Sequence, residues 1–262
     1  WNWIPTTTIL PLVSQVYLGS NVNPTAITWA YQGASVDTSS GTKVTLTFTS
    51  SSPNLSLTQI WWARPGVGPV EMSTAITNNT GGNVKYNYVD VISADLSVTS
   101  DDDVTVTRFD RASRTGDSGI DTGVFKDVMG ANSSISSTIS NDWPAGSYRL
   151  PYEILDVDST HGLYIGYTWD FGKFSNTTSG DAFQIRNKFY LGDSGSVTIV
   201  NNKVFNVPGM FFGVYKGDID TGSNAMKKWF WNYKITPTLK NNTNEPEVEF
   251  HVHEFAESGY NA

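Results

Sequence analysis

Cysteine is absent from this 262-residue chain, and charged residues make up only 16% of it. Without cysteine there are no disulfides, no thiol nucleophile and no cysteine-ligated zinc. No stretch approaches the run of about 20 apolar residues that a membrane-spanning helix requires. The few charges, together with 39% hydrophobic and 13% aromatic residues, exclude a coiled coil and wholesale disorder. The net charge of -8 argues against a surface that binds nucleic acid throughout, but it leaves a local basic patch open.

Apolar and polar residues alternate along much of the chain. In residues 43–49, Val44, Leu46 and Phe48 fall on one face and polar residues fall on the other, which is typical of a half-buried strand. The same pattern predicts strands at 26–31, 55–62, 84–92, 96–98, 104–109, 148–155, 163–169, 183–190, 197–200, 210–215, 229–235 and 247–255. So many short strands with polar turns predict an all-β protein, either a β-sandwich or a barrel.

Helical signals are weak by comparison. Residues 123–131 are compatible with two helical turns, and residues 224–229 with one turn that Ser223 would cap. Residues 101–121 and 132–141 are rich in polar and small residues and are interpreted as long surface loops. We expect one domain over 1–262, with a possible surface insertion within about 50–145.

Two short motifs resemble catalytic signatures. Gly-Asp-Ser-Gly occurs at 116–119 and 192–195 and resembles the nucleophile motif of trypsin-like serine proteases. That chemistry needs a histidine base, which lies far upstream of the serine in that family. Here no histidine precedes Ser118, and only His161 precedes Ser194. We therefore interpret both segments as tight turns.

The C-terminal segment carries a second candidate. Period-2 alternation places Glu249, His251 and His253 on one face of a strand, and the His-x-His pattern resembles the cupin metal signature. Cupins need a glutamate several residues later, but Glu254 follows at once and on the opposite face. We favour a solvated edge over a metal site. The same three residues could form a pH-sensitive subunit contact, because neighbouring acids raise the pKa of histidine.

Acidic clusters suggest either calcium or sugar chemistry. Asp101, Asp102 and Asp103 could hold calcium at a subunit interface, although acid triplets are more often simply solvated. Residues 164–171 could form an aromatic platform with an acid, as in sugar sites. Their alternation favours core positions instead. Asn-x-Ser/Thr sequons begin at Asn54, Asn78, Asn132, Asn176 and Asn241.

Basic residues are dense at one place in the sequence. Arg108, Arg111 and Arg114 form a cluster to which we add Lys227 and Lys228. These five residues could contact the phosphates of a nucleic acid. Nearby aspartates could instead neutralise the arginines as surface pairs, and no RNA-binding signature accompanies them.

The composition and strand pattern of the whole chain resemble those of the shell domain of a small icosahedral virus. The chain starts in mid-sequence at Trp1, and Lys43 is the only basic residue among the first 60, so a basic arm would lie upstream. Residues 209–215, 229–235 and 248–252 are similar to the closing strands of nodavirus-like and bacilladnavirus-like capsid proteins. This resemblance implies a single jelly roll of two four-stranded sheets with long loops.

The resemblance also implies a function without catalysis. Many copies would form a closed shell in a virion around a viral genome, bound chiefly through an upstream arm, with no cofactor other than the possible calcium. The alternative is a secreted carbohydrate-binding or carbohydrate-active β-sandwich. That alternative predicts an exposed aromatic patch, or two carboxyls about 5–10 Å apart in a cleft. A cupin-type metalloenzyme is a third possibility.

Overall fold

The computed structural model describes residues 13–86, 88–97, 104–111, 122–130, 132–139, 148–157, 159–168, 172–179, 182–190 and 197–235. These residues form three antiparallel sheets and one helix. The largest sheet has nine strands in the order β10 (Thr122–Met129), β9 (Val104–Arg111), β12 (Tyr148–Asp156), β13 (His161–Tyr167), β17 (Val204–Lys216), β6 (Val70–Asn78), β5 (Asn54–Ala63), β4 (Thr42–Ser51) and β3 (Ala30–Asp37).

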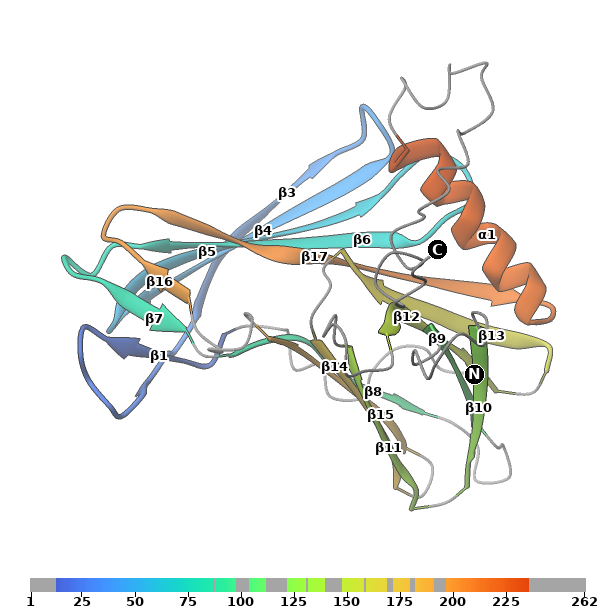
Figure 1. Cartoon of the computed structure of the whole chain (residues 1–262). Coiled ribbons are helices and arrows are strands. Elements are labelled where there is room, and N and C mark those ends of the chain that lie inside the picture. Colours follow the sequence, from blue (N-terminus) through green and yellow to red (C-terminus); the bar gives the residue numbers. More distant parts are fainter. Residues whose placement is uncertain are drawn as a thin grey trace, which may run out of the picture.

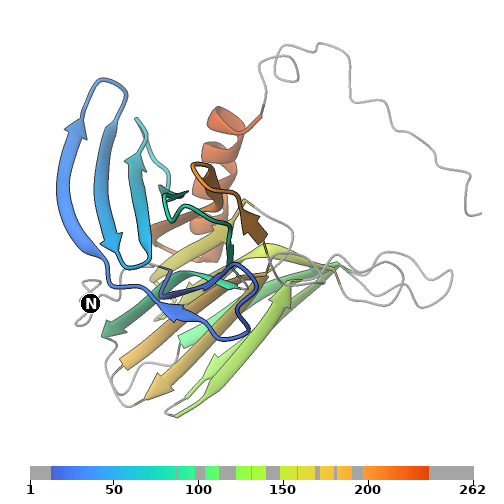
Figure 2. The same ribbon diagram turned by 90° about the vertical axis from the view of Figure 1, so that its left-hand side faces the viewer.

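Two four-stranded sheets complete the sheet structure. One has the order β11 (Ser134–Ile139), β14 (Gly172–Ser179), β15 (Ala182–Tyr190) and β8 (Tyr88–Ser97). The other has the order β16 (Val197–Ile199), β7 (Val84–Tyr86), β1 (Gln15–Leu18) and β2 (Thr25–Ala26). Figure 1 shows both small sheets on the same side of the nine-stranded sheet, and Figure 2 shows how strongly the large sheet twists.

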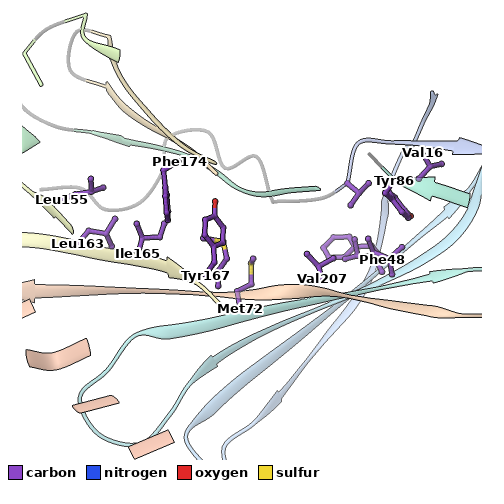
Figure 3. Packing of buried hydrophobic residues seen from close by; sticks show 14 of the residues in the cluster. Val16, Phe48, Met72, Tyr86, Leu155, Leu163, Ile165, Tyr167, Phe174 and Val207 are labelled. Carbon is purple, nitrogen blue, oxygen red and sulfur yellow. The ribbon is translucent and has the colours of Figure 1, made fainter. Parts of the chain in front are cut away.

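The main core lies between the large sheet and the two small ones. At one end Phe174 of β14 packs on Tyr167 of β13, with ring centroids 4.8 Å apart. At the other end Tyr86 of β7 and Phe48 of β4 belong to the same buried cluster (Figure 3). This packing of sheet on sheet confirms the expected all-β antiparallel sandwich. The nine-stranded sheet is larger than the four-stranded sheets that a viral jelly roll implies.

The opposite face of the large sheet carries α1 (Ile219–Tyr233) (Figure 1). Asp218 caps the helix by accepting a hydrogen bond from the Thr221 backbone N–H at 2.9 Å. Trp229 is only 1% exposed and packs on Phe211 of β17, with ring centroids 4.7 Å apart. A second buried cluster, formed with Ile154 and other residues of this face, lies under the helix. The helix therefore covers a face that would otherwise expose aromatic rings.

Glycines make room for those rings. A Cβ on Gly213 would lie 2.2 Å from the Tyr164 ring, and a Cβ on Gly166 would lie 2.3 Å from the Phe211 ring. In the strand register each glycine sits directly opposite the residue whose ring covers it, Gly213 opposite Tyr164 and Gly166 opposite Phe211. Aromatic rings thus lie flat across the sheet, where a larger residue would exclude them.

Two secondary-structure predictions are wrong. Residues 229–235 were expected to form a strand, but they complete and follow α1, because Gly222, Met226, Trp229 and Tyr233 share one helical face. Residues 123–131 were considered compatible with two helical turns, but most of them form β10, which pairs with β9 along its whole length. The alternation of aromatic residues at 229, 231 and 233 imitates a strand, and pairing to β9 overrides the weak helical signal.

Part of a predicted loop is also a strand. Residues 134–139, within the segment interpreted as a loop, form β11 at the edge of a sheet, paired with β14. No helix among the described residues is long and apolar enough to cross a membrane.

Candidate functional site

A row of six residues crosses the large sheet beneath α1. Strand register aligns each residue with the next, so all six project from the face that carries the helix. From β4 to β12 the row is Lys43, Trp62, Glu71, Phe211, Gly166 and Tyr152. Charged residues and tryptophan occupy one end, and apolar rings occupy the other. Two hollows lie along the row: Trp62, Glu71 and Phe211 line one, Phe211 and Tyr152 line the other, and residues of α1 line both.

Glu71 is the centre of the polar end. Its Oε1 accepts hydrogen bonds from Arg64 Nε and from Trp229 Nε1, the latter at 3.0 Å. Its Oε2 accepts from Lys234 Nζ at 2.7 Å and from Arg64 Nη2 at 3.3 Å. Burial alone would raise the pKa of Glu71, but these hydrogen bonds outweigh it and hold the pKa below its usual value. Glu71 is therefore charged at neutral pH.

Cations cover the nearby tryptophan. The Arg64 guanidinium lies 3.6 Å from the Trp62 ring centroid, and Lys43 Nζ lies 4.5 Å from it. Beside them is a cavity of about 150 Å³ that Glu71, Trp62 and Lys234 help to line. The carboxylate oxygens are already occupied by donors from the protein. The polar groups around this cavity therefore attach α1 to the sheet and are not available to bind a ligand.

The second hollow is larger and more apolar. It is an open groove of about 990 Å³ between the helix and strands β9, β12 and β17. One wall comes from the sheet, where the Phe109 and Tyr152 rings lie 4.9 Å apart. The other wall comes from α1 and includes Phe230 and Trp231, which are 50% and 55% exposed. Adjacent exposed rings beside an apolar groove form the kind of contiguous apolar surface that marks an interaction site.

The rim of the groove is polar and basic. It is lined by residues of α1: Ser223, Asn224, Lys227, Lys228 and Asn232. No aspartate or glutamate is among the described residues that line the groove. The arrangement combines apolar ring faces with hydroxyl, amide and ammonium donors. It can bind a molecule that has both apolar faces and hydrogen-bonding groups.

A buried polar cluster lies on the other face of the sheet, inside the sandwich. Glu153 of β12 is fully buried and accepts from Asn176 Nδ2 of β14, at 3.0 Å to one oxygen and 3.1 Å to the other. Burial raises the pKa of Glu153 to about 7, although Asn176 and Arg108 oppose the shift. The Asn176 Oδ1 is buried without a hydrogen-bond partner. The cluster bridges the two sheets and does not open into either hollow described above.

The predicted nucleic-acid residues are not brought together. Arg108 forms an ion pair with Asp127 of β10 inside the sandwich, so it does not present its charge to a surface ligand. Lys227 and Lys228 lie on α1, on the opposite side of the same sheet, and both are exposed. Arg111 ends β9, and its side chain lies outside the described part. Arg108 therefore does not share a surface with Lys227 and Lys228, and the structure does not test the contribution of Arg111 and Arg114.

Several other predicted sites fall outside the described residues. These are Arg114, the calcium candidates Asp101, Asp102 and Asp103, both Gly-Asp-Ser-Gly segments, and Glu249, His251 and His253. Within the described ranges, no group of three or more His, Asp or Glu side chains could hold a metal ion. The proposed aromatic platform is partly described. Tyr167 is buried with Leu163 and Ile165, as the core interpretation predicts, and Tyr164 is buried on the other face of the strand.

The sequence analysis named Lys227 and Lys228, which line the groove, but it missed most of the other residues that form the site. Glu71 lies in β6, which was not predicted, although Met72, Thr74 and Ile76 alternate there as in the other strands. Tyr152 was assigned to a strand but not to a site. Trp231 was placed in a strand instead of on a helix. Only the register between strands far apart in sequence joins these residues.

The fold is similar to that of parts of known glycoside hydrolases. No protein-family model matches the sequence, and no curated protein matches it. An α-galactosidase from Lactobacillus brevis superposes with a TM-score of 0.63 and 14% identity, over 82% of this chain and 30% of that chain. The GH36 α-galactosidase AgaB from Geobacillus stearothermophilus superposes with a TM-score of 0.63 and 12% identity, over 80% of this chain and 31% of that chain. The galactosidase domain of the α-galactosidase-sucrose kinase AgaSK superposes with a TM-score of 0.62 and 10% identity, over 80% of this chain and 31% of that chain.

These similarities correct the viral interpretation of the sequence. The three structural neighbours named above are chains of glycoside hydrolases, and nothing in the comparisons points to a capsid protein. Low charge and abundant aromatic residues suit any large β-sandwich core, so this composition does not distinguish a shell from another sandwich. The chain spans about a third of the length of those neighbours. At this level of identity the likeness concerns the fold alone.

Proposed function

We propose that this chain is a non-catalytic, carbohydrate-binding β-sandwich and that its sugar site is the groove beside α1. One observation carries the proposal: an open groove of about 990 Å³ displays exposed aromatic rings on a fold shared with α-galactosidase chains. The proposal corresponds to the alternative drawn from the sequence, which predicts an exposed aromatic patch.

The groove has the chemistry that a sugar needs. A pyranose ring has an apolar face of C–H groups, which packs on an aromatic ring, and a rim of hydroxyls, which need hydrogen-bond partners. Trp231 and Tyr152 supply rings from opposite walls. Asn224 and Ser223 supply hydrogen-bonding groups along the helix. The volume is sufficient for several sugar rings, so an oligosaccharide is the expected ligand.

The absence of acids from the described lining supports binding without hydrolysis. Most glycoside hydrolases use two carboxyl groups that flank the scissile bond. The two glutamates with special environments are not available for this. Glu71 is held by Arg64, Trp229 and Lys234, and Glu153 is enclosed between the sheets. We therefore expect the chain by itself to bind glycans without cleaving them.

Titration with α-galactosides tests the proposal. The GH36 α-galactosidase AgaA has been observed in complex with raffinose and with stachyose, so both sugars are suitable first probes, together with a broader glycan panel. We expect binding that quenches or shifts tryptophan fluorescence, without release of galactose. Trp231→Ala should weaken binding about tenfold, since one aromatic contact contributes about 1.5 kcal/mol.

A matched control is available on another part of the surface. Tyr31 of β3 is also an exposed aromatic residue, at 59%, and it does not line the groove. Tyr31→Ala should leave affinity unchanged, and circular dichroism should show that both variants fold. If no glycan binds the wild-type chain, or if the two variants lose affinity equally, the groove is not a sugar site.

A further inference from the structure

The position of α1 determines the width of the groove. Phe230, Trp231 and Lys227 form the helix wall, while the sheet wall is fixed by strand pairing. At its N-terminal end the helix packs closely on the sheet, because a Cβ on Gly222 would lie 2.5 Å from the Tyr215 ring. The C-terminal half, which carries the exposed aromatic residues, needs its own attachment.

That attachment is made at one carboxylate, that of Glu71. Of the groups that donate to Glu71, Trp229 and Lys234 belong to the last turn of α1 and its C-cap. Arg64 approaches Glu71 from the segment after β5. Its guanidinium also lies 4.9 Å from the Tyr233 ring centroid, and Tyr233 donates its hydroxyl to the Pro65 carbonyl at 2.5 Å. Among the described residues, Glu71 is the anion that lies between Arg64 and Lys234, two cations that would repel each other without it.

We propose that Glu71 is a positioning residue for the groove: through Arg64, Trp229 and Lys234 it holds the C-terminal half of α1 in the place where Trp231 faces bound sugar. The inference rests on the proposed sugar site and concerns its regulation. Glu71 itself touches the smaller hollow and not the groove. Its effect on binding therefore passes through the helix.

The charged groups around Glu71 define how this contact responds to pH. Arg64 and Lys234 pair with it directly, and Lys43 lies on the far side of Trp62 beside Asp37. Because hydrogen bonds lower the pKa of Glu71, its charge persists throughout the neutral range. Protonation in acid removes the attraction to both cations. Sugar affinity should therefore fall in acid below the ordinary titration range of glutamate.

The test compares Glu71→Gln with a matched control. Gln keeps the size of the side chain and an acceptor for Trp229 but removes the charge. Asp127→Asn removes the carboxylate of another ion pair, the one with Arg108, on the opposite face of the same sheet. We expect E71Q to lower affinity for the bound α-galactoside about tenfold and to speed hydrogen exchange over residues 229–234. D127N should change stability but neither of these readouts.

Two further measurements separate positioning from general stability. The affinity of E71Q should no longer depend on pH in acid, where that of the wild type falls. Lys234→Gln should weaken binding in the same direction, and the double variant should be no weaker than E71Q, because both act through one contact. If the wild type binds sugar and E71Q binds it equally well, the positioning role is wrong and the sugar site stands. If the wild type binds no glycan, both proposals fail.

Discussion

Glu153 should make the protein less stable as the pH rises. The carboxyl is fully buried between β12 and β14, and the partner that donates to it is a neutral amide, Asn176. Burial is the largest influence and raises its pKa from 4.5 to about 7. Between these two pH values the folded protein keeps a proton that the unfolded chain releases. The stability that this proton provides is complete below pH 4.5 and is lost as pH rises through 7.

The magnitude follows from the two pKa values. Each pH unit in this window costs about 1.36 kcal/mol, so the 2.5 units between 4.5 and 7 amount to about 3–4 kcal/mol. Glu153→Gln removes the titration. Its amide can accept from Asn176 Nδ2 and can also donate to Asn176 Oδ1, which is buried without a partner. We expect E153Q to be more stable than the wild type by up to about 3–4 kcal/mol at pH 8, with little difference at pH 4.5.

Urea unfolding followed by tryptophan fluorescence at pH 4.5, 6, 7 and 8 measures this difference. The diagnostic quantity is the change with pH of the gap between E153Q and wild type, because every other titrating group cancels. E71Q serves as the control, because the pKa of Glu71 is lowered, so the gap between E71Q and wild type should stay constant from pH 6 to 8. A gap for E153Q that stays constant from pH 4.5 to 8, or an E153Q protein less stable at pH 8, would refute a neutral buried carboxyl.

Two other predictions concern packing and modification. Gly213→Ala should destabilise the protein by about 1–3 kcal/mol, because its Cβ would lie 2.2 Å from the Tyr164 ring; Gly33→Ala, which has nothing within 4 Å, should change the thermal midpoint little. If the chain is secreted from a eukaryotic host, mapping of glycopeptides in the folded product should find glycans at exposed sequons and not at buried ones. The described sequons are the exposed Asn54 and Asn132 and the buried Asn78 and Asn176. Glycan at Asn176 in folded protein would contradict the packing of Glu153.

Local alternation was sufficient to predict the fold class. Val44, Leu46 and Phe48 have the period of a strand, and β4 forms there with the expected polar and apolar sides. The pattern depends on residues two apart, so it survives without any knowledge of the partner strand. The same period at Trp229, Trp231 and Tyr233 was misleading, because a helical face also includes positions four apart, and the sheet beneath selected that face.

The candidate site could not be predicted in this way. Lys43, Trp62, Glu71, Phe211 and Tyr152 come from five strands and meet in one row because of their register. Nothing in the residues near Glu71 indicates that its partners are Trp229 and Lys234, which lie 158 and 163 residues further along the chain. Arg108 shows that proximity in sequence can also mislead. Its position near other arginines suggested a basic patch, but in the folded sheet it is buried and paired with Asp127.

The sequence by itself therefore determined the period of the strands, the low charge and the absence of cysteine chemistry, since these are properties of neighbouring residues or of composition. Tertiary structure alone decided which side of the large sheet each residue faces, where α1 rests, and that an aromatic groove opens beside it. The physical reason is that a strand buries its side chains only against a partner. The choice among partners is made by packing of the whole sandwich, whose free energy is shared among contacts distant in sequence.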